Sequence, residues 1–333
     1  MLSDKELLHF ISTENREETE GLFKSAQKVR EEHFGKTVYF RGLIEFTNYC
    51  KNDCYYCGIR RSNTRLKRYR LSREQILECC RNGKRLGLRT FVLQGGEDSW
   101  FTDERLCKIV RAVRAEFPDH AITLSIGERS RKSYEALFKA GVNRYLLRHE
   151  SADDKHYRAM HPPEMKLPAR KECLFALKEI GFETGAGFMT GSPFQTPQSL
   201  LADLRFLAEL EPRMVGIGPF IPAANTPFEN HPPGDAGLTL RILALTRLLL
   251  PRVLLPATTA LGTLTKDGRE QALAAGANVL MPNLTPQNVR KLYSIYDNKI
   301  SNNDAAESVR YLVKKIKELG YIPDCLDPAD FIA

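Results

Sequence analysis

One short segment, 46–58, constrains this chain more than any other. It carries three cysteines, Cys50, Cys54 and Cys57, at the spacing C-x3-C-x2-C, directly after the strand-like run Val38–Phe46. A cubane iron–sulfur cluster normally takes four thiolates, and no fourth cysteine follows close behind. An iron without a protein ligand has an open coordination position, which is what distinguishes a catalytic metal site from a structural one. We therefore predict a 4Fe–4S cluster with one iron free to bind a ligand.

Three other interpretations of these cysteines are weaker. A structural zinc site needs a fourth Cys or His at a suitable spacing, and none follows nearby. A disulfide framework is typical of small secreted proteins rather than of a 333-residue chain with eight scattered cysteines. Chance clustering is the last alternative, and the position of the motif directly after a strand argues against it.

The chain is basic, and much of its excess charge is local. Its formal net charge is +8, from 49 Lys and Arg against 41 Asp and Glu. The window 60–73 has no acidic residue and holds seven cations, Arg60, Arg61, Arg65, Lys67, Arg68, Arg70 and Arg73. Such a run is typical of a solvated rim beside the cluster or of a docking surface for an acidic reductant. Nucleic acid is not favoured as a partner, because no nucleic-acid-binding motif accompanies the run.

The N-terminus predicts a helix and not a signal peptide, because Ser3 and Glu6 form a capping box before apolar residues. The longest apolar region, 240–257, is interrupted by Arg241, Arg247 and a proline, so we expect no membrane span. Free cysteines without a signal sequence predict a cytoplasmic protein.

Short apolar runs alternate with helix-like runs along the chain, and eight of them are strand candidates: Val38–Phe46, Thr90–Gln94, Ala121–Ile126, Asn143–His149, Phe182–Phe188, Met214–Ile217, Val253–Thr258 and Asn278–Met281. Eight βα alternations favour an α/β fold, specifically a complete (β/α)8 TIM-type barrel, over an open sheet. We expect one domain, with a helical N-terminal extension at 1–36, the barrel at 37–300, and a C-terminal helix (Ala305–Leu319) and tail at 301–333. The tail is expected to be irregular around Pro323.

Active sites of such barrels lie at the C-terminal ends of the strands, so residues just past each strand are the candidates. After the second strand, Gly95 and Gly96 allow close approach of the backbone to a ligand, and Glu97 could accept an ammonium group. The alternative is a tight turn with a solvated acid. Ser125 ends the third strand as a polar contact or a helix cap.

The fourth strand is the most informative after the cysteines. Strand alternation places Arg144, Arg148 and Glu150 on one face. Buried arginines need anionic partners, and Glu150 can pair with only one of them. The spare charge would suit an anionic substrate, and a structural ion pair is the alternative. The last two strands end beside further candidates for the substrate site, which are Thr258, Thr259, Ala260, Met281 and Tyr293.

The other cysteines are expected to be ordinary, mostly buried thiols: Cys79, Cys80, Cys107 and Cys173 in helices, and Cys325 in the tail. Among the histidines, His149 is expected to adjoin the site, and most of the others are expected to be surface or satisfied core residues.

Six segments match one family closely: Glu45–Cys50, Cys57–Arg61, Leu93–Asp98, Arg144–Glu150, Gly216–Pro222 and Pro256–Gly262. They resemble the HydE family of FeFe-hydrogenase maturases, within the radical S-adenosylmethionine (SAM) superfamily. The similarity runs from about residue 40 to about residue 300, and the run Arg144–Glu150 is far more specific than the cysteine motif.

The resemblance implies an enzyme with a closed cavity inside its barrel. Cys50, Cys54 and Cys57 would hold the cluster, and Tyr56 would lie against the adenine of SAM. The remaining SAM contacts would be Gly95, Gly96, Glu97, Ser125, Glu150 and Arg170. The substrate cavity and its anion sites would be lined by Arg144, Arg148, Thr258, Thr259, Ala260 and Tyr293.

The resemblance also implies a reaction. SAM would be cleaved reductively to a deoxyadenosyl radical, which would act on a sulfur-bearing iron–cysteine complex with carbonyl and cyanide ligands. That complex would be a precursor of the dithiomethylamine-bridged diiron subcluster of the hydrogenase. The implied partners are an electron donor such as ferredoxin or flavodoxin and other hydrogenase maturation proteins.

One departure from the family bears on the cofactor count. Many members carry further cysteines near the C-terminus that bind a second cluster, whereas 299–304 has none here and only Cys325 lies in the tail. We therefore expect one cluster. The alternatives are a methylornithine synthase-like radical enzyme, a biotin synthase-like enzyme, which would need further cysteines at strand ends, and a non-enzymatic iron–sulfur carrier or scaffold. An RNA-modifying or RNA-binding protein that uses the 60–73 run is the remaining class.

Overall fold

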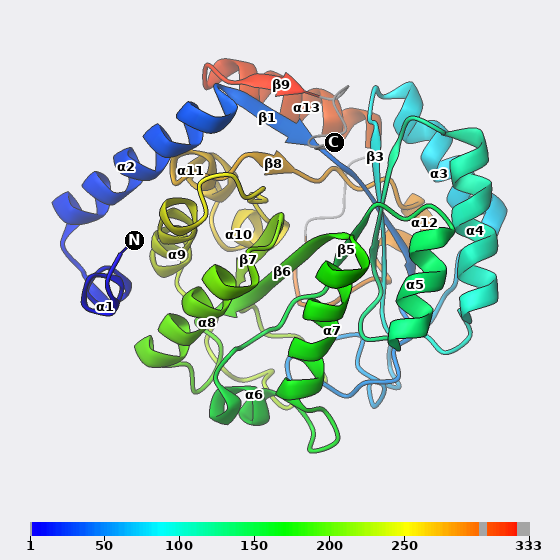
Figure 1. Ribbon diagram of the computed structural model, residues 1–333, viewed down its shortest axis with the longest axis horizontal. Coiled ribbons are helices and arrows are strands. Elements are labelled where there is room, and N and C mark those ends of the chain that lie inside the picture. The colour runs from blue at the N-terminus through cyan, green and yellow to red at the C-terminus, as the bar shows by residue number, and fades with distance from the viewer. Residues whose placement is uncertain (1, 300–304, 325–333) are drawn as a thin grey trace.

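The computed structural model describes residues 2–299 and 305–324. Strands and helices alternate along most of this part of the chain, and Figure 1 shows the helices on the outside of the strands. The strands are β1 (Thr37–Phe40), β2 (Gly42–Thr47), β3 (Thr90–Gly95), β4 (Ala121–Ser125), β5 (Arg144–Leu146), β6 (Glu183–Thr190), β7 (Met214–Pro219), β8 (Val279–Leu280) and β9 (Ile322–Asp324). The helices are α1 (Asp4–Ser12), α2 (Arg16–Phe34), α3 (Arg73–Arg85), α4 (Asp103–Glu116), α5 (Arg131–Lys139), α6 (Asp154–Met160), α7 (Leu167–Ile180), α8 (Pro197–Leu210), α9 (Ala236–Leu249), α10 (Thr259–Leu264), α11 (Gly268–Ala274), α12 (Gln287–Arg290) and α13 (Ala305–Glu318).

The strands form two sheets in which every pairing is parallel. The larger sheet has six strands in the order β2-β3-β4-β5-β6-β7, and the smaller has three in the order β8-β1-β9. Neighbours in the larger sheet are consecutive in the chain, and parallel neighbours need crossover connections, which the intervening helices supply. The predicted α/β fold is confirmed.

A complete barrel is not confirmed, because the two sheets are not joined by continuous ladders. The first predicted strand is interrupted at Arg41, so β1 pairs in the smaller sheet and β2 in the larger. The seventh, Val253–Thr258, is not a named strand and makes isolated bridges, Met214 to Leu254 and Pro256 to Val279. Proline has no N–H to donate to a ladder, so Pro256 limits pairing in this segment.

The C-terminal tail differs from the expectation in one respect. The region around Pro323 was expected to be irregular, but it forms β9, which pairs with β1 from Thr37 to Tyr39. Strand β9 lies at the edge of its sheet, where a proline is tolerated. The preceding helix α13 agrees with the expected Ala305–Leu319 to within one residue.

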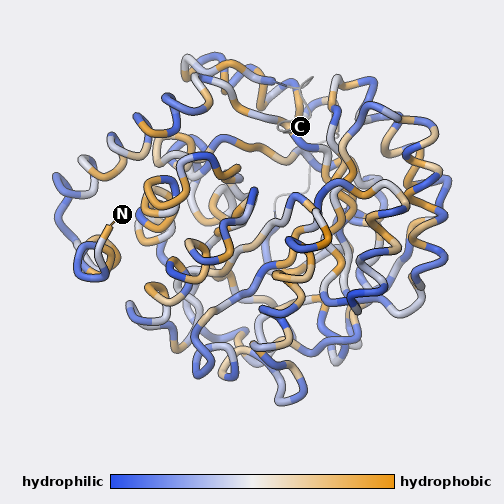
Figure 2. Tube along the Cα trace, in the orientation of Figure 1, coloured by the Kyte–Doolittle hydropathy of each residue, from blue (hydrophilic) through white to orange (hydrophobic). Residues whose placement is uncertain are grey.

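Helix ends follow the local sequence signals. Ser3 caps α1 and Ser72 caps α3, each in a capping box with the residue three positions later. The helices are amphipathic, and Figure 2 shows hydrophobic and hydrophilic residues alternating along them. Near the N-terminus, α2 packs against α9, and α1 packs against α8 and α9. Within the described part of the chain, the helices are too short or too polar to cross a bilayer.

Candidate active site

The three cysteines of the motif lie on a loop that ordinary protein contacts already hold in shape. One side chain, Arg68, donates from both guanidinium Nη atoms to four backbone carbonyls of the loop, those of Asn48, Ile59, Arg60 and Asn63. The Arg60 Nε donates to Asp53 Oδ1 at 2.7 Å, and Arg70 makes a two-pronged pair with Asp98. Three cations of the basic run are therefore structural, while Arg61, Arg65, Lys67 and Arg73 are exposed.

The chemistry of these thiols fits an iron–sulfur cluster better than a single metal ion. Burial raises the pKa of Cys57 to about 12 and also raises the pKa values of Cys50 and Cys54, so bare thiols would be protonated and a bound metal would displace the protons. Among the described residues, no three Cys, His, Asp or Glu side chains converge on one point that could hold a single ion. A cubane places each cysteine on a different iron, so its three thiolates need not converge on a single point.

A cavity of about 620 Å³ opens beside the cysteines at the ends of the strands. All but one of the residues predicted for the cluster, SAM and substrate line it: Cys50, Cys54, Tyr56, Cys57, Gly95, Gly96, Glu97, Ser125, Arg148, Glu150, Arg170, Thr258, Thr259, Ala260, Met281 and Tyr293. Residues from nearly the whole length of the chain thus meet around one space. Most of these residues were predicted because they lie just past the C-terminal end of a strand.

Arg144 is the exception, and its assignment to the substrate cavity is wrong. Its guanidinium pairs with Glu183 and lies 3.5 Å from Thr90 Oγ1, in a small separate space at the opposite ends of the strands. Arg144 begins β5, whereas Arg148 lies four residues later, beyond the end of that strand at Leu146. An extended chain advances by about 3.3 Å per residue, so these four residues separate the two arginines by roughly 13 Å.

The Gly95–Gly96 turn is required by protein packing. A Cβ at Gly96 would lie 2.3 Å from the Tyr49 carbonyl oxygen, so the turn is pressed against the start of the cysteine loop. The Lys51 N–H donates to the Glu97 carbonyl at 2.9 Å and ties the same two segments together. The Glu97 carboxylate accepts from the Glu128 N–H at 2.9 Å and lies 3.2 Å from Lys51 Nζ.

The Arg148–Glu150 pair faces the cavity in an incompletely satisfied state. Arg148 Nη2 lies 3.3 Å from Glu150 Oε2 without hydrogen-bond geometry, and both atoms, together with Arg148 Nε, are buried without a hydrogen-bond partner among the described residues. Glu150 also has a φ of 64°, the left-handed region that non-glycine residues seldom adopt. Buried charges in this condition suit a ligand that supplies the missing partners.

Glu128 and His161 contact residues predicted to bind SAM, and neither was found from the sequence. Glu128 pairs with Arg170, whose Nε lies 2.7 Å from Glu128 Oε1. His161 follows α6, and its Nε2 lies 3.1 Å from the Tyr56 hydroxyl, while its ring stacks on Tyr157 at 4.1 Å. Burial lowers the pKa of His161 to about 3, so the ring is neutral. His161 could have been suspected only from knowing that α6 returns to the cysteine loop, where the Tyr55 N–H donates to the Met160 carbonyl.

The seventh predicted strand, Val253–Thr258, ends at the cavity wall, where one threonine caps a helix and the next makes a polar contact. The Thr258 hydroxyl accepts from the Leu261 N–H and caps α10. Thr259 Oγ1 accepts from Arg269 Nη2 at 3.3 Å. Burial lowers the pKa of Arg269, which also lines the cavity and had not been predicted. Tyr293 accepts at its hydroxyl from Gln94 Nε2 at 3.3 Å.

The remaining cysteines are where the sequence placed them. Cys79, Cys80 and Cys107 are buried in α3 and α4, and Cys173 is half-buried in α7, all as free thiols. Cys325 and residues 300–304, for which the sequence predicts no cluster ligand, lie outside the described residues.

Residues 44–207 match the model of the radical SAM superfamily. The HydE subunit of the [FeFe] hydrogenase maturase of Thermotoga maritima is 45% identical over 315 residues, which cover 94% of this chain and 89% of that protein. The chain belongs to the radical SAM superfamily. It is a radical SAM enzyme that closely resembles HydE, as the sequence indicated.

Other relatives agree with this placement. The 3-methylornithine synthase of Methanosarcina acetivorans is 31% identical over 97% of this chain and 90% of its own length. Among solved structures, methylornithine synthase (PylB) has a TM-score of 0.86 at 28% identity and covers 99% of this chain and 96% of its own. The maturase HydG from Carboxydothermus hydrogenoformans has a TM-score of 0.82 at 24% identity over 97% of this chain and 76% of its own, which supports the fold alone.

Proposed function

We propose that this protein is a radical SAM maturase of FeFe-hydrogenase that acts on a sulfur-bearing iron–cysteine carbonyl/cyanide precursor of the dithiomethylamine-bridged diiron subcluster. The observation that carries the proposal is the 45% identity with HydE along nearly the full chain. The cavity described above, with three thiols at its rim and unsatisfied charges in its wall, supports it.

A bound 4Fe–4S cluster and SAM would supply electron transfer and cleavage of the sulfonium to give a deoxyadenosyl radical. Cys50, Cys54 and Cys57 would hold the cluster and leave one iron for SAM. Tyr56, kept in place by His161, would lie against the adenine. Glu97, Ser125, Glu150 and Arg170 would orient the rest of SAM, with the Gly95–Gly96 turn beside the cluster.

On the substrate side, Arg148, Thr258, Thr259, Ala260, Met281 and Tyr293 would form the wall of the reaction cavity. Arg148 would bind an anionic group of the substrate, such as a carboxylate or a cyanide ligand, because its guanidinium has donors without partners among the described residues. Walls of this kind exclude water from a reactive radical.

We also infer one closed barrel at 37–300, with 1–36 as a helical extension and 301–333 as a C-terminal helix and tail of the same domain. Three isolated parallel bridges, including Leu43 to Asn283, lie between the two sheets where a continuous ladder would close the ring. Strands β1 and β2 are nearly continuous, and they belong to different sheets.

An electron donor such as ferredoxin or flavodoxin would dock on the exposed cations Arg61, Arg65, Lys67 and Arg73 beside the cysteine loop. Other hydrogenase maturation proteins are the further expected partners. A single cluster and a cytoplasmic location remain predictions, the first because the sequence from 299 to 304 has no cysteine.

Replacement of Cys54 tests the proposal. Cys54→Ala should abolish reductive cleavage of SAM, and the reconstituted wild-type protein should hold about four irons per chain. Cys173→Ala, which removes a half-buried thiol of α7, is the control and should retain both properties. Undiminished cleavage in the Cys54 variant would rule out the cluster assignment, and a count near eight irons would reveal a second cluster.

The same anaerobic assay separates the alternatives. Deoxyadenosine release driven by lysine would favour a methylornithine synthase-like activity, which the similarity to those enzymes makes the second candidate. Transfer of the cluster to an acceptor without SAM cleavage would indicate an iron–sulfur carrier.

A further inference from the structure

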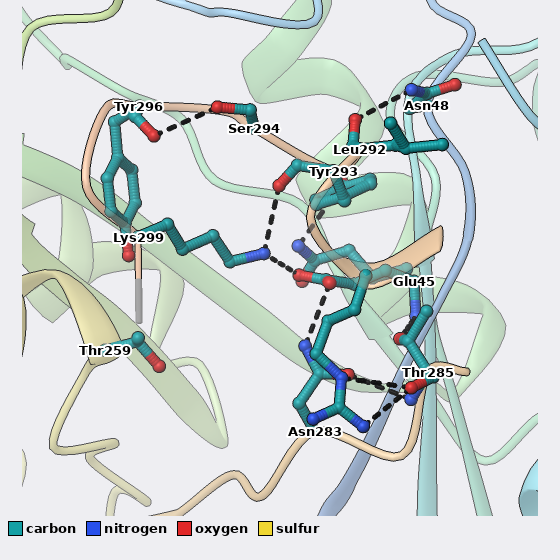
Figure 3. Close-up of polar contacts among 12 residues, drawn as sticks. Glu45, Asn48, Thr259, Asn283, Thr285, Leu292, Tyr293, Ser294, Tyr296 and Lys299 are labelled. Atoms are coloured by element: carbon teal, nitrogen blue, oxygen red, sulfur yellow. Dashed lines mark hydrogen bonds and ion pairs between the residues drawn. The ribbon is translucent and has the colours of Figure 1, made fainter. Parts of the chain in front are cut away.

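A buried ion pair lies in the cavity wall, and none of the roles assigned above uses it. Glu45 of β2 is fully buried, and Lys299 reaches it from the segment that follows Tyr293. Both side chains line the main cavity. Figure 3 shows the Lys299 side chain extended toward the Glu45 carboxylate, with Asn283 on the other side of that carboxylate.

The groups around the Lys299 ammonium form a receptor for a primary amine. Lys299 Nζ donates to Glu45 Oε1 and, at 3.1 Å, to the Tyr293 carbonyl, and it lies 4.7 Å from the centre of the Tyr293 ring. Asn283 Nδ2 donates to the other Glu45 oxygen at 2.9 Å and holds the carboxylate in place. A carboxylate, a carbonyl and an aromatic face are the groups that recognise an ammonium.

The carboxylate of the receptor and the lysine that occupies it belong to different parts of the fold. Glu45 sits on a strand of the larger sheet, whereas Lys299 lies outside any helix or strand, after α12. Leaving the carboxylate buried without a cation is strongly unfavourable, so this position demands a positive charge. The flexible four-carbon stem of a lysine can withdraw, and the adjoining cavity has room for a ligand that brings its own ammonium.

We propose that Glu45, Asn283 and Tyr293 form an ammonium subsite of the cavity, and that Lys299 is an internal occupant replaced by the amino group of a ligand. Arg148 and Arg269 line the same cavity, so the ligand class is a zwitterion of amino-acid type, with its carboxylate on a guanidinium. The inference rests on the proposed function for the role of the cavity and names the subsite that would hold the amino group of an amino-acid-type ligand there.

The test removes the occupant and offers a substitute. n-Propylammonium corresponds to the lysine side chain beyond Cβ, and its binding to anaerobic, reconstituted protein without reductant can be measured by calorimetry. We expect Lys299→Ala to bind n-propylammonium at least tenfold more tightly than the wild type does. The double variant Lys299→Ala, Glu45→Gln should lose that gain. Lys266→Ala, which removes an exposed lysine of the same cavity, is the matched control and should show no gain.

Two further ligands test the proposed ligand class. 4-Aminobutyrate, which adds a carboxylate to the same amine, should bind Lys299→Ala more tightly than n-propylammonium, and weaker binding would overturn the zwitterion. Tetramethylammonium, which has no N–H donor, should gain nothing from the substitution, and an equal gain would overturn hydrogen-bonded recognition.

If Lys299→Ala does not fold, addition of n-propylammonium during refolding should recover soluble protein, and the double variant should fold without it. The proposal is overturned by the absence of a gain or recovery, or by an equal gain in the double variant or in Lys266→Ala. SAM is not turned over in these measurements, so their failure leaves the proposed function standing. The Cys54→Ala assay tests separately whether cluster-dependent cleavage of SAM is the chemistry of the protein.

Discussion

Two arginines on one strand and its continuation meet opposite environments. Arg144 is almost fully buried, and its Nε is 2.5 Å from Glu183 Oε2 at the far end of the sheet. Arg148 is a third exposed at its side chain, faces the cavity, and meets Glu150 at 3.3 Å in poor geometry. The comparison teaches that a charge matched by the protein supports the fold, whereas a charge left unmatched beside a cavity is available to a ligand.

The largest expected effect is a loss of stability on replacement of Arg144, whose charge is matched by Glu183. Arg144→Met removes one member of the Arg144–Glu183 ion pair, and loss of one member of a buried pair should lower the free energy of unfolding by about 3 kcal/mol. Urea denaturation measures this. Glu183→Gln in the same chain should recover part of the loss, and a change below about 0.5 kcal/mol, the range of ordinary surface substitutions, would contradict the comparison.

The free energy of unfolding should depend on pH through His161, which lies beside Tyr56 of the cavity wall. Its pKa is about 3 in the folded protein because the ring is buried, against about 6.5 in an unfolded chain. Between these values the unfolded state binds one more proton, so stability should fall by about 1.4 kcal/mol for each pH unit below 6.5. His161→Gln should remove that part of the slope in denaturation measured from pH 7 to pH 5. An unchanged slope would mean that His161 titrates in the folded protein as it does in the unfolded chain.

Arg148→Met should separate binding from stability. We expect the affinity for a small anion such as cyanate to fall about tenfold, which is about 1.4 kcal/mol, with a smaller loss of stability than Arg144→Met shows. Calorimetric titration of the two variants side by side provides the contrast. Equal anion affinities in Arg148→Met and wild type would return Arg148 to a structural role.

The smallest effect concerns the backbone of Glu150. Its φ of 64° is strained for a side chain with a Cβ, so Glu150→Gly should be about 1 kcal/mol more stable than Glu150→Ala. Thermal unfolding of the pair measures the difference. Equal stability of the two variants would show that the left-handed conformation is relaxed in the variants.

Much of the fold followed from local signals, and its failures have physical causes. Seven of the eight predicted strands overlap a strand of the structure, because short β-branched runs between capped helices are local features. The exception, Val253–Thr258, makes only isolated bridges in the described structure. Whether a short segment forms a ladder depends on how neighbours approach it in space, and a proline inside it reduces the number of donors.

The site was predictable to the extent that it follows strand ends. The cysteines, Glu97 and Glu150 meet at one cavity because parallel strands point the same way. The error at Arg144 has a different source, since alternation gives the face of a strand and not the height along it. Lys299 and Glu45 are separated by 254 positions, and no local pattern indicates that a lysine near the end of the chain neutralises a strand near its start.

The contacts of the cysteine loop have a consequence for biosynthesis. Asn48 donates to the carbonyl of Leu292, 244 positions later, and the Gly58 N–H donates to that of Ile295. A chain emerging from the ribosome therefore carries its cysteines long before it can complete their cradle. Iron delivered before residues 292–295 are made would meet a loop that still lacks these two ties.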